Sequence, residues 1–286
     1  MTAGRKNIAL TTPLVYAFLF SYLAITLFPL LWVIYTSLKP SRDIFLSPFQ
    51  LPNLDQLTWS NFTSAWVDGH FGDYFLNSIV VTVITVIATL VVAAMAAYAL
   101  ARFTFPGARP LLFFFLAGLM VPLQLTIVPL FFEMKFLGLL GSRSGLILVY
   151  IATSIPFAVF ILTGFFKSLP ASLHESALLD GCTEIDAFWR VMLPLARPGL
   201  LTVAIFSFLG SWNEYFMAFM FLSGEGGESA RTLPLGLAHI TIVGQYRTDW
   251  GMTFAGLVIV MLPTLVAYIF MQRHLTRGVT LGAMKG

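Results

Sequence analysis

The sequence predicts an all-α membrane protein with six transmembrane helices and a polar helix-turn-helix element between the fourth and the fifth. Hydrophobic residues make up 58% of the 286-residue chain and charged residues only 10%, and the mean hydropathy is +0.87. A typical soluble domain has about 25% charged residues. Six segments are apolar enough to cross a bilayer, for which about 20 residues suffice. One intervening stretch, 168–197, is polar and carries helix start and stop signals.

The expected spans lie near residues 12–37, 76–101, 111–131, 145–166, 199–222 and 252–271. The first span is far longer than the apolar core of a signal peptide, which has about 7–15 residues, and this length favours a retained anchor. No soluble domain interrupts the spans. The sequence therefore predicts a single transmembrane domain over residues 1–286.

Lysine and arginine are distributed unequally between the two sides of the membrane. Ten of the 16 lie on the side that holds both chain ends and the loop 168–197, and six lie on the other side. Positive residues mark the cytoplasmic side. We therefore expect both termini and 168–197 on the cytoplasmic side of the membrane. The positive residues flank the spans and form no single patch, so nothing indicates nucleic-acid binding.

Two long loops, 38–75 and 223–251, are expected on the outer side. The first is rich in turn-forming proline, asparagine and aspartate, with a short helix expected from Ser60 to Val67. The second is rich in glycine, and we expect it to reach outward flexibly.

The stretch 168–197 is predicted to form two short helices joined by a tight turn. Pro170 suits the first turn of a helix, and Glu175 lies early in that helix, where the helix dipole favours a carboxylate. Gly181 can adopt the left-handed backbone that stops a helix. Thr183 and Asp186 are spaced as a capping box with Asp in place of Glu, which predicts a second helix.

The second helix carries Phe188, Trp189 and Val191, and Pro194 and Pro198 are expected to end it. These side chains give the element an apolar face, which favours docking to another protein. Alternatively, the aromatic rings lie against lipid headgroups or against the protein's own spans. The single cysteine, Cys182, is interpreted as a small filler of the turn.

The spacing of this element resembles a motif of bacterial ABC importer membrane subunits, written EAA, three residues, G, nine residues, then I-x-L-P. Glu175, Ala177, Gly181, Leu193 and Pro194 match it in register, and Ser176 and Val191 are conservative departures. The segment 210–215 and the tail 280–286 are similar to carbohydrate permeases of the MalG type. The likeness covers essentially the whole chain and implies the type I ABC importer permease fold.

The resemblance implies a non-catalytic, multi-pass subunit of an ATP-driven sugar importer in a bacterial cytoplasmic (inner) membrane. Its partners would be a second permease in a heterodimer, a pair of ATPase subunits that bind ATP and Mg²⁺, and an extracytoplasmic solute-binding protein. The seven motif residues would couple to the ATPase, and so would the tail residues. The tail comprises Leu281, Gly282, Ala283, Met284 and Lys285. The loop around Gly224, Gly226 and Gly227 occupies the place where family members contact the binding protein.

The chain carries no motif for independent catalysis. A P-loop needs a lysine directly after a glycine, and none of the five lysines has one. No His or Cys pair has the spacing of a zinc site, and nothing forms a hydrolytic triad. No cofactor or metal is therefore expected in this chain.

Glu214 is the ionisable residue that stands out within the spans. Together with Ser207, Gly210, Ser211 and Ala218 it lies on one small, polar face of the fifth span. A carboxylate at this depth should face a wet cavity or a partner. In one interpretation Glu214, Asn213 and Trp212 line the sugar path, and in the other Glu214 holds an interface or gate.

Two further features of the spans are a glutamine between prolines and a row of small residues. Gln124 lies between Pro122 and Pro129, where it could line the path or bond carbonyls that the prolines free. The row Thr85, Thr89, Ala93 and Ala97 indicates close helix packing.

Two classes of alternative function remain open from the sequence. The chain could be a self-sufficient secondary transporter or channel for a small polar solute, which should transport alone. It could also be a structural scaffold, although the polar face of the fifth span disfavours this. Within the importer class, the cargo could be a polyol or glycerol phosphate in place of a sugar.

Overall fold

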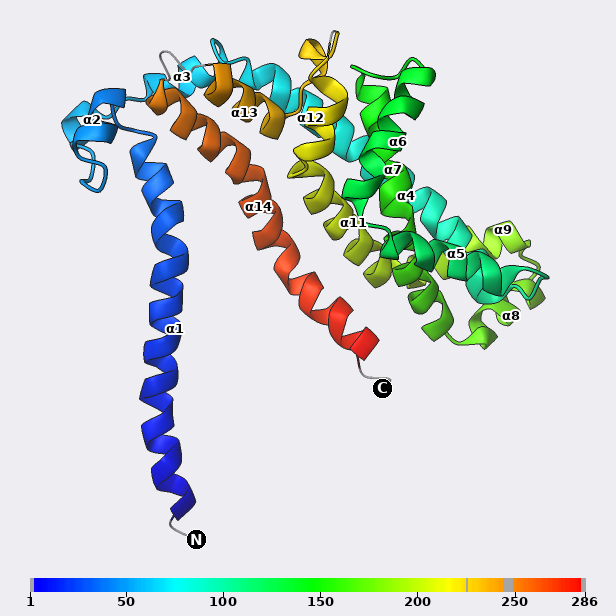
Figure 1. The fold of residues 1–286 in the computed structure, drawn as a ribbon. Coiled ribbons are helices and arrows are strands. Elements are labelled where there is room, and N and C mark those ends of the chain that lie inside the picture. Colours follow the sequence, from blue (N-terminus) through cyan, green and yellow to red (C-terminus); the bar gives the residue numbers. More distant parts are fainter. Residues whose placement is uncertain (1–2, 225, 244–248, 284–286) are drawn as a thin grey trace. The chain divides into compact units, whose positions relative to one another are not determined.

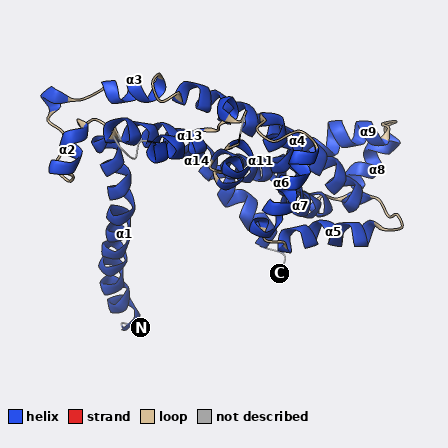
Figure 2. Ribbon diagram, turned by 45° about the horizontal axis from the view of Figure 1, so that its top comes forward, coloured by secondary structure: helices blue, strands red, loops and turns tan. Residues whose placement is uncertain are grey.

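A computed structural model describes residues 3–224, 226–243 and 249–283, with side chains described over 12–224, 226–241 and 249–272. Most of the described residues lie in helices, and none lies in a strand. The all-α class is confirmed. Figure 1 shows the elements in chain order, and Figure 2 shows the same helices from a second direction.

Four helices in the described residues are individually long and apolar enough to span a membrane. They are α1 (Ala3–Thr36), α4 (Phe71–Arg102), α7 (Arg143–Ser168) and α14 (Trp250–Ala283). Two bent helix pairs pass the same test, so the count rises to six if each pair is one span. The predicted number of spans is reached only by including these bent pairs.

The third expected span, 111–131, is not one straight helix. It divides into α5 (Ala108–Met120) and α6 (Leu123–Phe136), which meet at an angle of 102°. Val121 precedes a proline and adopts an extended backbone, with φ −81° and ψ 116°. A residue before proline is pushed away from the helical region by the ring, which explains the break.

The fifth expected span, 199–222, is also interrupted. α11 (Arg197–Trp212) ends before Asn213, and α12 (Phe216–Leu222) begins after Tyr215. At its other end, α11 bends by 74° from the helical stretch Glu184–Leu195. The assumption of a single continuous helix was wrong for this span.

The chain divides into two compact units, and the first combines Met1–Phe71 with Leu237–Met261. It contains α2 (Ser41–Leu46), the 3₁₀ turn η1 (Leu54–Gln56) and α3 (Ser60–Trp66), the last of which confirms the short helix expected there. The Lys39 ammonium donates to the carbonyls of Ser47 and Gln50 at 2.6 and 2.7 Å. This loop is therefore fastened to the end of α1.

The second unit combines Gly72–Gly236 with Leu262–Gly286 and has two buried clusters. The first, which we call the Phe188 cluster, comprises Ala93, Ala94, Ala97, Tyr98, Leu100, Ala158, Val159, Leu162, Phe166, Phe188, Met192, Ala196 and Val203. The second, which we call the Leu222 cluster, comprises Val81, Met134, Leu146, Val149, Tyr150, Met217, Ala218, Phe221, Leu222, Ala230 and Leu235. The small-residue row of α4, Thr85 to Ala97, is fully buried, which confirms its packing role.

The loop 223–251 is more ordered than its glycine content predicts. It contains the 3₁₀ turn η3 (Glu228–Ala230) and α13 (Leu233–Val243). The Asn77 amide donates to the carbonyls of Ser229 and Arg231, both at 2.9 Å, and the Ser78 hydroxyl accepts from Leu233 N at 2.8 Å. The expectation of a freely flexible loop was wrong for 228–233, because α4 anchors this part.

Candidate functional sites: a helix-turn-helix element and a polar cavity

The first helix of the polar stretch is α8 (Ala171–Leu179). Pro170 lies at its N-cap, one position before the expected first turn. No acidic residue lies in the first turn, because Glu175 is the fifth of nine residues. The helix dipole acts mainly over the first turn, so the dipole explanation for Glu175 was wrong.

The turn after α8 is a complete Schellman motif. Gly181 has φ +86°, in the left-handed region that glycine adopts without cost. The Cys182 amide donates to Ala177 O at 3.0 Å, and the Gly181 amide donates to Leu178 O at 3.0 Å. The prediction that Gly181 stops this helix is confirmed.

The second helix begins at the predicted capping box. The Thr183 side chain accepts from Asp186 N at 3.2 Å, and its hydroxyl donates to the Asp186 carboxylate at 2.6 Å. The helix continues through α9 (Glu184–Asp186), a π-helical turn η2 (Ala187–Met192) and α10 (Leu193–Leu195). Pro194 lies inside this helix, so the expectation that it ends the helix was wrong.

The hydrogen bond donated by Thr183 holds the pKa of Asp186 below its usual range. Burial raises this pKa to a smaller extent, and the nearby Arg190 charge lowers it. A lowered carboxyl pKa contributes stability above the unfolded-state pKa, and this contribution is lost as the pH falls through the folded-state pKa. We therefore expect the start of the second helix to weaken only under acidic conditions.

Replacement of Thr183 by alanine should loosen this start without unfolding the subunit. An N-cap residue is worth about 1 kcal/mol, so amide hydrogen exchange over 184–187 should rise about fivefold. Ser172→Ala, at an exposed position on α8, is the matched control and should leave exchange there unchanged. Equal exchange in both variants would mean that the capping box contributes nothing.

The two short helices are tied together across the turn. His174 Nε2 of α8 lies 2.8 Å from the Glu184 carboxylate of α9. The His174 ring also packs edge-on against Tyr98 of α4, with ring centroids 6.2 Å apart. The element is thus linked to α4 as well as to α7, from which it continues.

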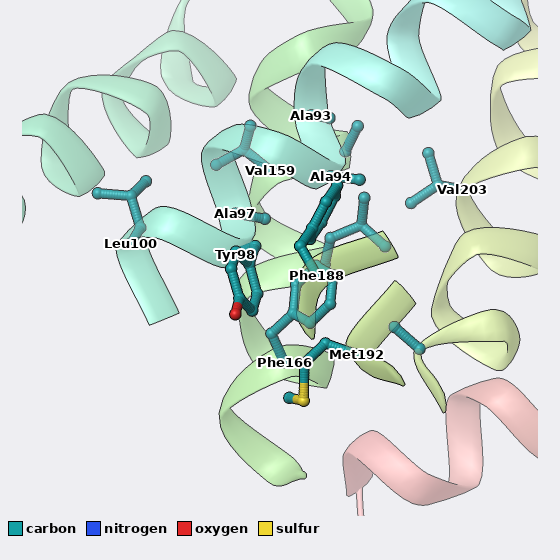
Figure 3. Packing of buried hydrophobic residues seen from close by; sticks show 13 residues of the cluster. Ala93, Ala94, Ala97, Tyr98, Leu100, Val159, Phe166, Phe188, Met192 and Val203 are labelled. Carbon is teal, nitrogen blue, oxygen red and sulfur yellow. The ribbon is translucent and has the colours of Figure 1, made fainter. Parts of the chain in front are cut away.

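One face of the element is buried in the Phe188 cluster. Phe188 is 6% exposed, and its ring centroid lies 4.9 Å from Tyr98 of α4 and 6.4 Å from Phe166 of α7. Figure 3 shows Phe188 beside these two rings, below Ala94 and Ala97 of α4. Val191 and Leu193 pack at the edge of the cluster, and Ala177 is buried. For Phe188 the interpretation as part of an exposed docking patch was wrong, and the alternative, in which the ring lies against the protein's own spans, is confirmed.

The remaining motif residues are exposed. These are Glu175, Ser176, Gly181 and Pro194. Beside them, Leu179 is 88% exposed and Ile185 is 71% exposed, and Trp189 is about half exposed. We call these four motif residues, with Leu179 and Ile185, the exposed turn face.

Leu179 and Ile185 were missed in the sequence. Their exposure could have been predicted, because each lies within four residues of the helix-stopping Gly181. A turn between two short helices leaves such side chains few neighbours to pack against.

The polar face of α11 lines a cavity of about 180 Å³. The lining residues come from α6, α7, α11 and α12 and are Leu123, Tyr150, Thr153, Ser154, Phe206, Ser207, Gly210, Ser211, Glu214 and Met217. The predicted polar face is therefore found at the cavity, with Ser207, Gly210, Ser211 and Glu214 together. Glu214 lies beyond the end of α11, which stops at Trp212.

Glu214 lies in the break between α11 and α12 and is held by three donors. Its carboxylate accepts from the Tyr150 hydroxyl at 2.6 Å, from Met217 N at 2.7 Å and from Ala218 N at 3.0 Å. The last two are free amides at the start of α12, which need an acceptor. Glu214 therefore caps α12 and joins it to α7, and this position also places it in the cavity wall.

Replacement of Tyr150 by phenylalanine should destabilise this junction. The variant removes a hydrogen bond to a charged group, worth about 1.5–3 kcal/mol, and leaves a carboxylate oxygen with one donor fewer. We expect a lower thermal unfolding midpoint in detergent. Tyr16→Phe, at an exposed position on α1, is the control and should not change the midpoint. Equal midpoints would show that the Tyr150–Glu214 bond is energetically unimportant.

The other expected path residues do not join the cavity lining. Trp212 is 2% exposed and packs between Phe75 and Phe208, with centroid distances of 5.7 and 5.8 Å. The Asn213 amide donates to Leu209 O at 2.9 Å, and its oxygen accepts from Thr264 of α14 at 3.1 Å. Gln124 is exposed, next to the lining residue Leu123.

The remaining expected site residues lie at the loop and the tail. Gly226 has φ +82°, and a Cβ added at Gly227 would overlap the Leu222 carbonyl, so both glycines are needed for this turn. Gly224 has open space around it. Leu281, Gly282 and Ala283 continue α14 with side chains that are not described, and Met284 and Lys285 lie outside the described residues.

Comparison with known proteins gives consistent matches. Residues 89–281 match the family described as "Binding-protein-dependent transport system inner membrane component". The diacetylchitobiose uptake system permease protein NgcG of Streptomyces coelicolor is 42% identical, covering 94% of this chain and 88% of that protein. The trehalose transport system permease protein SugB of Mycobacterium tuberculosis is 36% identical, covering 91% of this chain and 93% of that protein.

The fold is also shared with a solved structure. A chain of a bacterial ABC transporter involved in the import of the acidic polysaccharide alginate superposes with a TM-score of 0.76. It is 24% identical, and the match covers 91% of this chain and 95% of that chain. The matched family region, 89–281, contains the helix-turn-helix element and every residue that lines the cavity.

Proposed function

We propose a function on one premise: the chain belongs to the family of binding-protein-dependent transport system inner membrane components. It is a multi-pass, non-catalytic permease subunit of an ABC importer. Its partners are a second permease, a pair of ATPase subunits that hydrolyse ATP, and an extracytoplasmic solute-binding protein. Both termini and the element 168–197 lie on the cytoplasmic side.

The cargo is a carbohydrate. This assignment is supported by the relatives, whose names give diacetylchitobiose and trehalose as their cargo. Each match covers more than nine-tenths of this chain. Of the path residues proposed from the sequence, Glu214 borders the cavity. The other three, Trp212, Asn213 and Gln124, act as packing or gate residues.

The helix-turn-helix element docks on the ATPase. The observation that carries this proposal is the exposed turn face, where Leu179 and Ile185 lie beside Glu175. Exposed apolar side chains on a polar, membrane-external segment favour a protein partner. The buried face, centred on Phe188, makes the element part of the same packed body as α4 and α7. Movement of the ATPase pair would therefore move these spans.

Two further contacts follow from the family. The tail residues 281–285 contact the ATPase pair, and the turn around Gly224, Gly226 and Gly227 contacts the binding protein. Anchoring of the neighbouring segment 228–233 to α4 by Asn77 and Ser78 supports a turn that is presented in one fixed position.

Replacement of Glu175 by lysine tests the docking. Glu175 is exposed, so the variant should fold and assemble in the membrane, but the reversed charge should lower ATP-driven uptake by reconstituted complexes at least tenfold. Glu133→Lys, at an exposed carboxylate of α6, is the matched control and should transport normally. Normal uptake by the Glu175 variant, or uptake by this chain alone in vesicles, would overturn the proposed function.

A further inference from the structure

Three serine hydroxyls in the cavity wall have no hydrogen-bond partner among the described residues. They belong to Ser154 of α7 and to Ser207 and Ser211 of α11, the last two only 7% and 9% exposed. Serine and threonine in helices often donate to the carbonyl four residues back. Thr153 and Thr202 of the same two helices do so, at 2.9 Å each, whereas these three serines do not.

Ser207 and Ser211 are buried residues and Ser154 is half-buried, and polar groups in such places usually bond to the protein or to a molecule that enters the site. The three hydroxyls come from two helices and line one space. Each can donate one hydrogen bond and accept two. The cavity therefore offers a set of adaptable donors and acceptors, the complement of a molecule that itself carries hydroxyl groups.

The cavity wall carries one charged group, and it is negative. Both oxygens of Glu214 accept hydrogen bonds, from three donors in all, which fixes the carboxyl group at the cavity wall. No lysine or arginine is among the described residues that line the cavity. An anionic ligand would meet a like charge with no positive group to offset it, whereas a neutral ligand would not.

The volume limits what can enter. About 180 Å³ lies below the ~300–1,000 Å³ of pockets that hold drug-sized ligands. One sugar ring or a short polyol is the largest unit of this chemistry that the space suits. A longer cargo would occupy it one unit at a time.

We infer that this cavity is a cargo subsite for one uncharged, hydroxyl-bearing unit, bound through Ser154, Ser207 and Ser211. The Glu214 carboxylate, fixed by Tyr150 and by the start of α12, excludes acidic units. The inference rests on the proposed function and narrows its cargo to neutral carbohydrates. The cargo would therefore differ in charge from the acidic polysaccharide imported by the transporter that shares this fold. Glycerol phosphate is excluded as a cargo.

The test measures direct binding to the complex of both permeases and the ATPase pair in nanodiscs. The binding protein is left out because it selects cargo itself. Saturation-transfer NMR with diacetylchitobiose and trehalose as neutral probes, and with an alginate disaccharide as the acidic probe, gives the affinities. We expect at least one neutral probe to bind at least tenfold more tightly than the acidic one. Equal affinities, or stronger binding of the acidic probe, would overturn the inference.

Two variants assign the binding to this cavity. Ser207→Ala with Ser211→Ala removes two hydrogen bonds and should weaken neutral-probe binding about tenfold. Ser144→Ala, at an exposed position of α7 outside the cavity, should leave it unchanged. Glu214→Gln should raise the affinity for the acidic probe at least threefold. Neutral-probe affinity unchanged by the serine variant would place the binding elsewhere.

Failure of the subsite is distinguishable from failure of the proposed function. Wild-type complex supplied with its binding protein should show ATP-dependent uptake whether or not the subsite exists. Normal uptake together with wild-type probe binding by the serine variant overturns the subsite alone. Absence of uptake by the fully assembled wild-type complex overturns the proposed function.

Discussion

Replacement of Gly181 by proline is expected to lower ATP-driven uptake at least a hundredfold while the subunit still inserts and assembles. Gly181 has φ +86°, whereas the proline ring fixes φ near −65°. Proline also removes the amide that donates to Leu178 O. The turn would have to open, so the exposed turn face would no longer be held in one arrangement. Uptake by reconstituted complexes, measured with subunit stoichiometry, checks this.

Two alanine variants separate the effect of the left-handed backbone at position 181 from the effect of adding a side-chain carbon. A Cβ at Gly181 meets nothing within 4 Å, so Gly181→Ala tests the left-handed backbone alone, which costs an L-residue about 1–2 kcal/mol. We expect a partial loss of uptake. Gly164 of α7 also has open space but no positive φ, so Gly164→Ala should be neutral. Wild-type uptake by the proline variant would show that the turn does not take part in coupling.

The turn could be predicted from sequence because its determinants are local. The left-handed glycine, the capping box from Thr183 to Asp186 and the short helix at Ser60 each depend on residues within one or two turns of helix. The number of spans could be predicted for a similar reason, because length and hydropathy determine whether a helix can cross a bilayer.

The features that were predicted wrongly depend on contacts between distant segments. Phe188 is buried because α4 and α7 supply Tyr98 and Phe166, which lie far away in the sequence. Hydropathy could not reveal the break in the fifth span, because apolar residues continue on both sides of it, and the Glu214 carboxylate that caps α12 is also held by Tyr150 of α7, 64 residues away in the sequence. Prolines indicated the break at Val121 and Pro122, but not its angle of 102°.

Truncation of Phe188 to alanine should give the largest loss of stability among these variants. Its ring is nearly fully buried between helices α4 and α7. Removal of a buried phenylalanine side chain costs about 3–5 kcal/mol, because the surrounding side chains fill the space only partly. We expect a strongly lowered unfolding midpoint in detergent and faster proteolysis within residues 168–197.

Trp189→Ala is the matched control, because the neighbouring side chain is about half exposed on the same π-helical turn. It should change the midpoint little. The Phe188 variant should also uncouple transport, because the element would no longer move as one body with α4 and α7. Rapid proteolysis of 168–197 combined with unimpaired ATP-driven uptake would mean that force reaches the spans by another route. The continuous chain from α10 into α11, across the 74° bend, would then be the connection to examine.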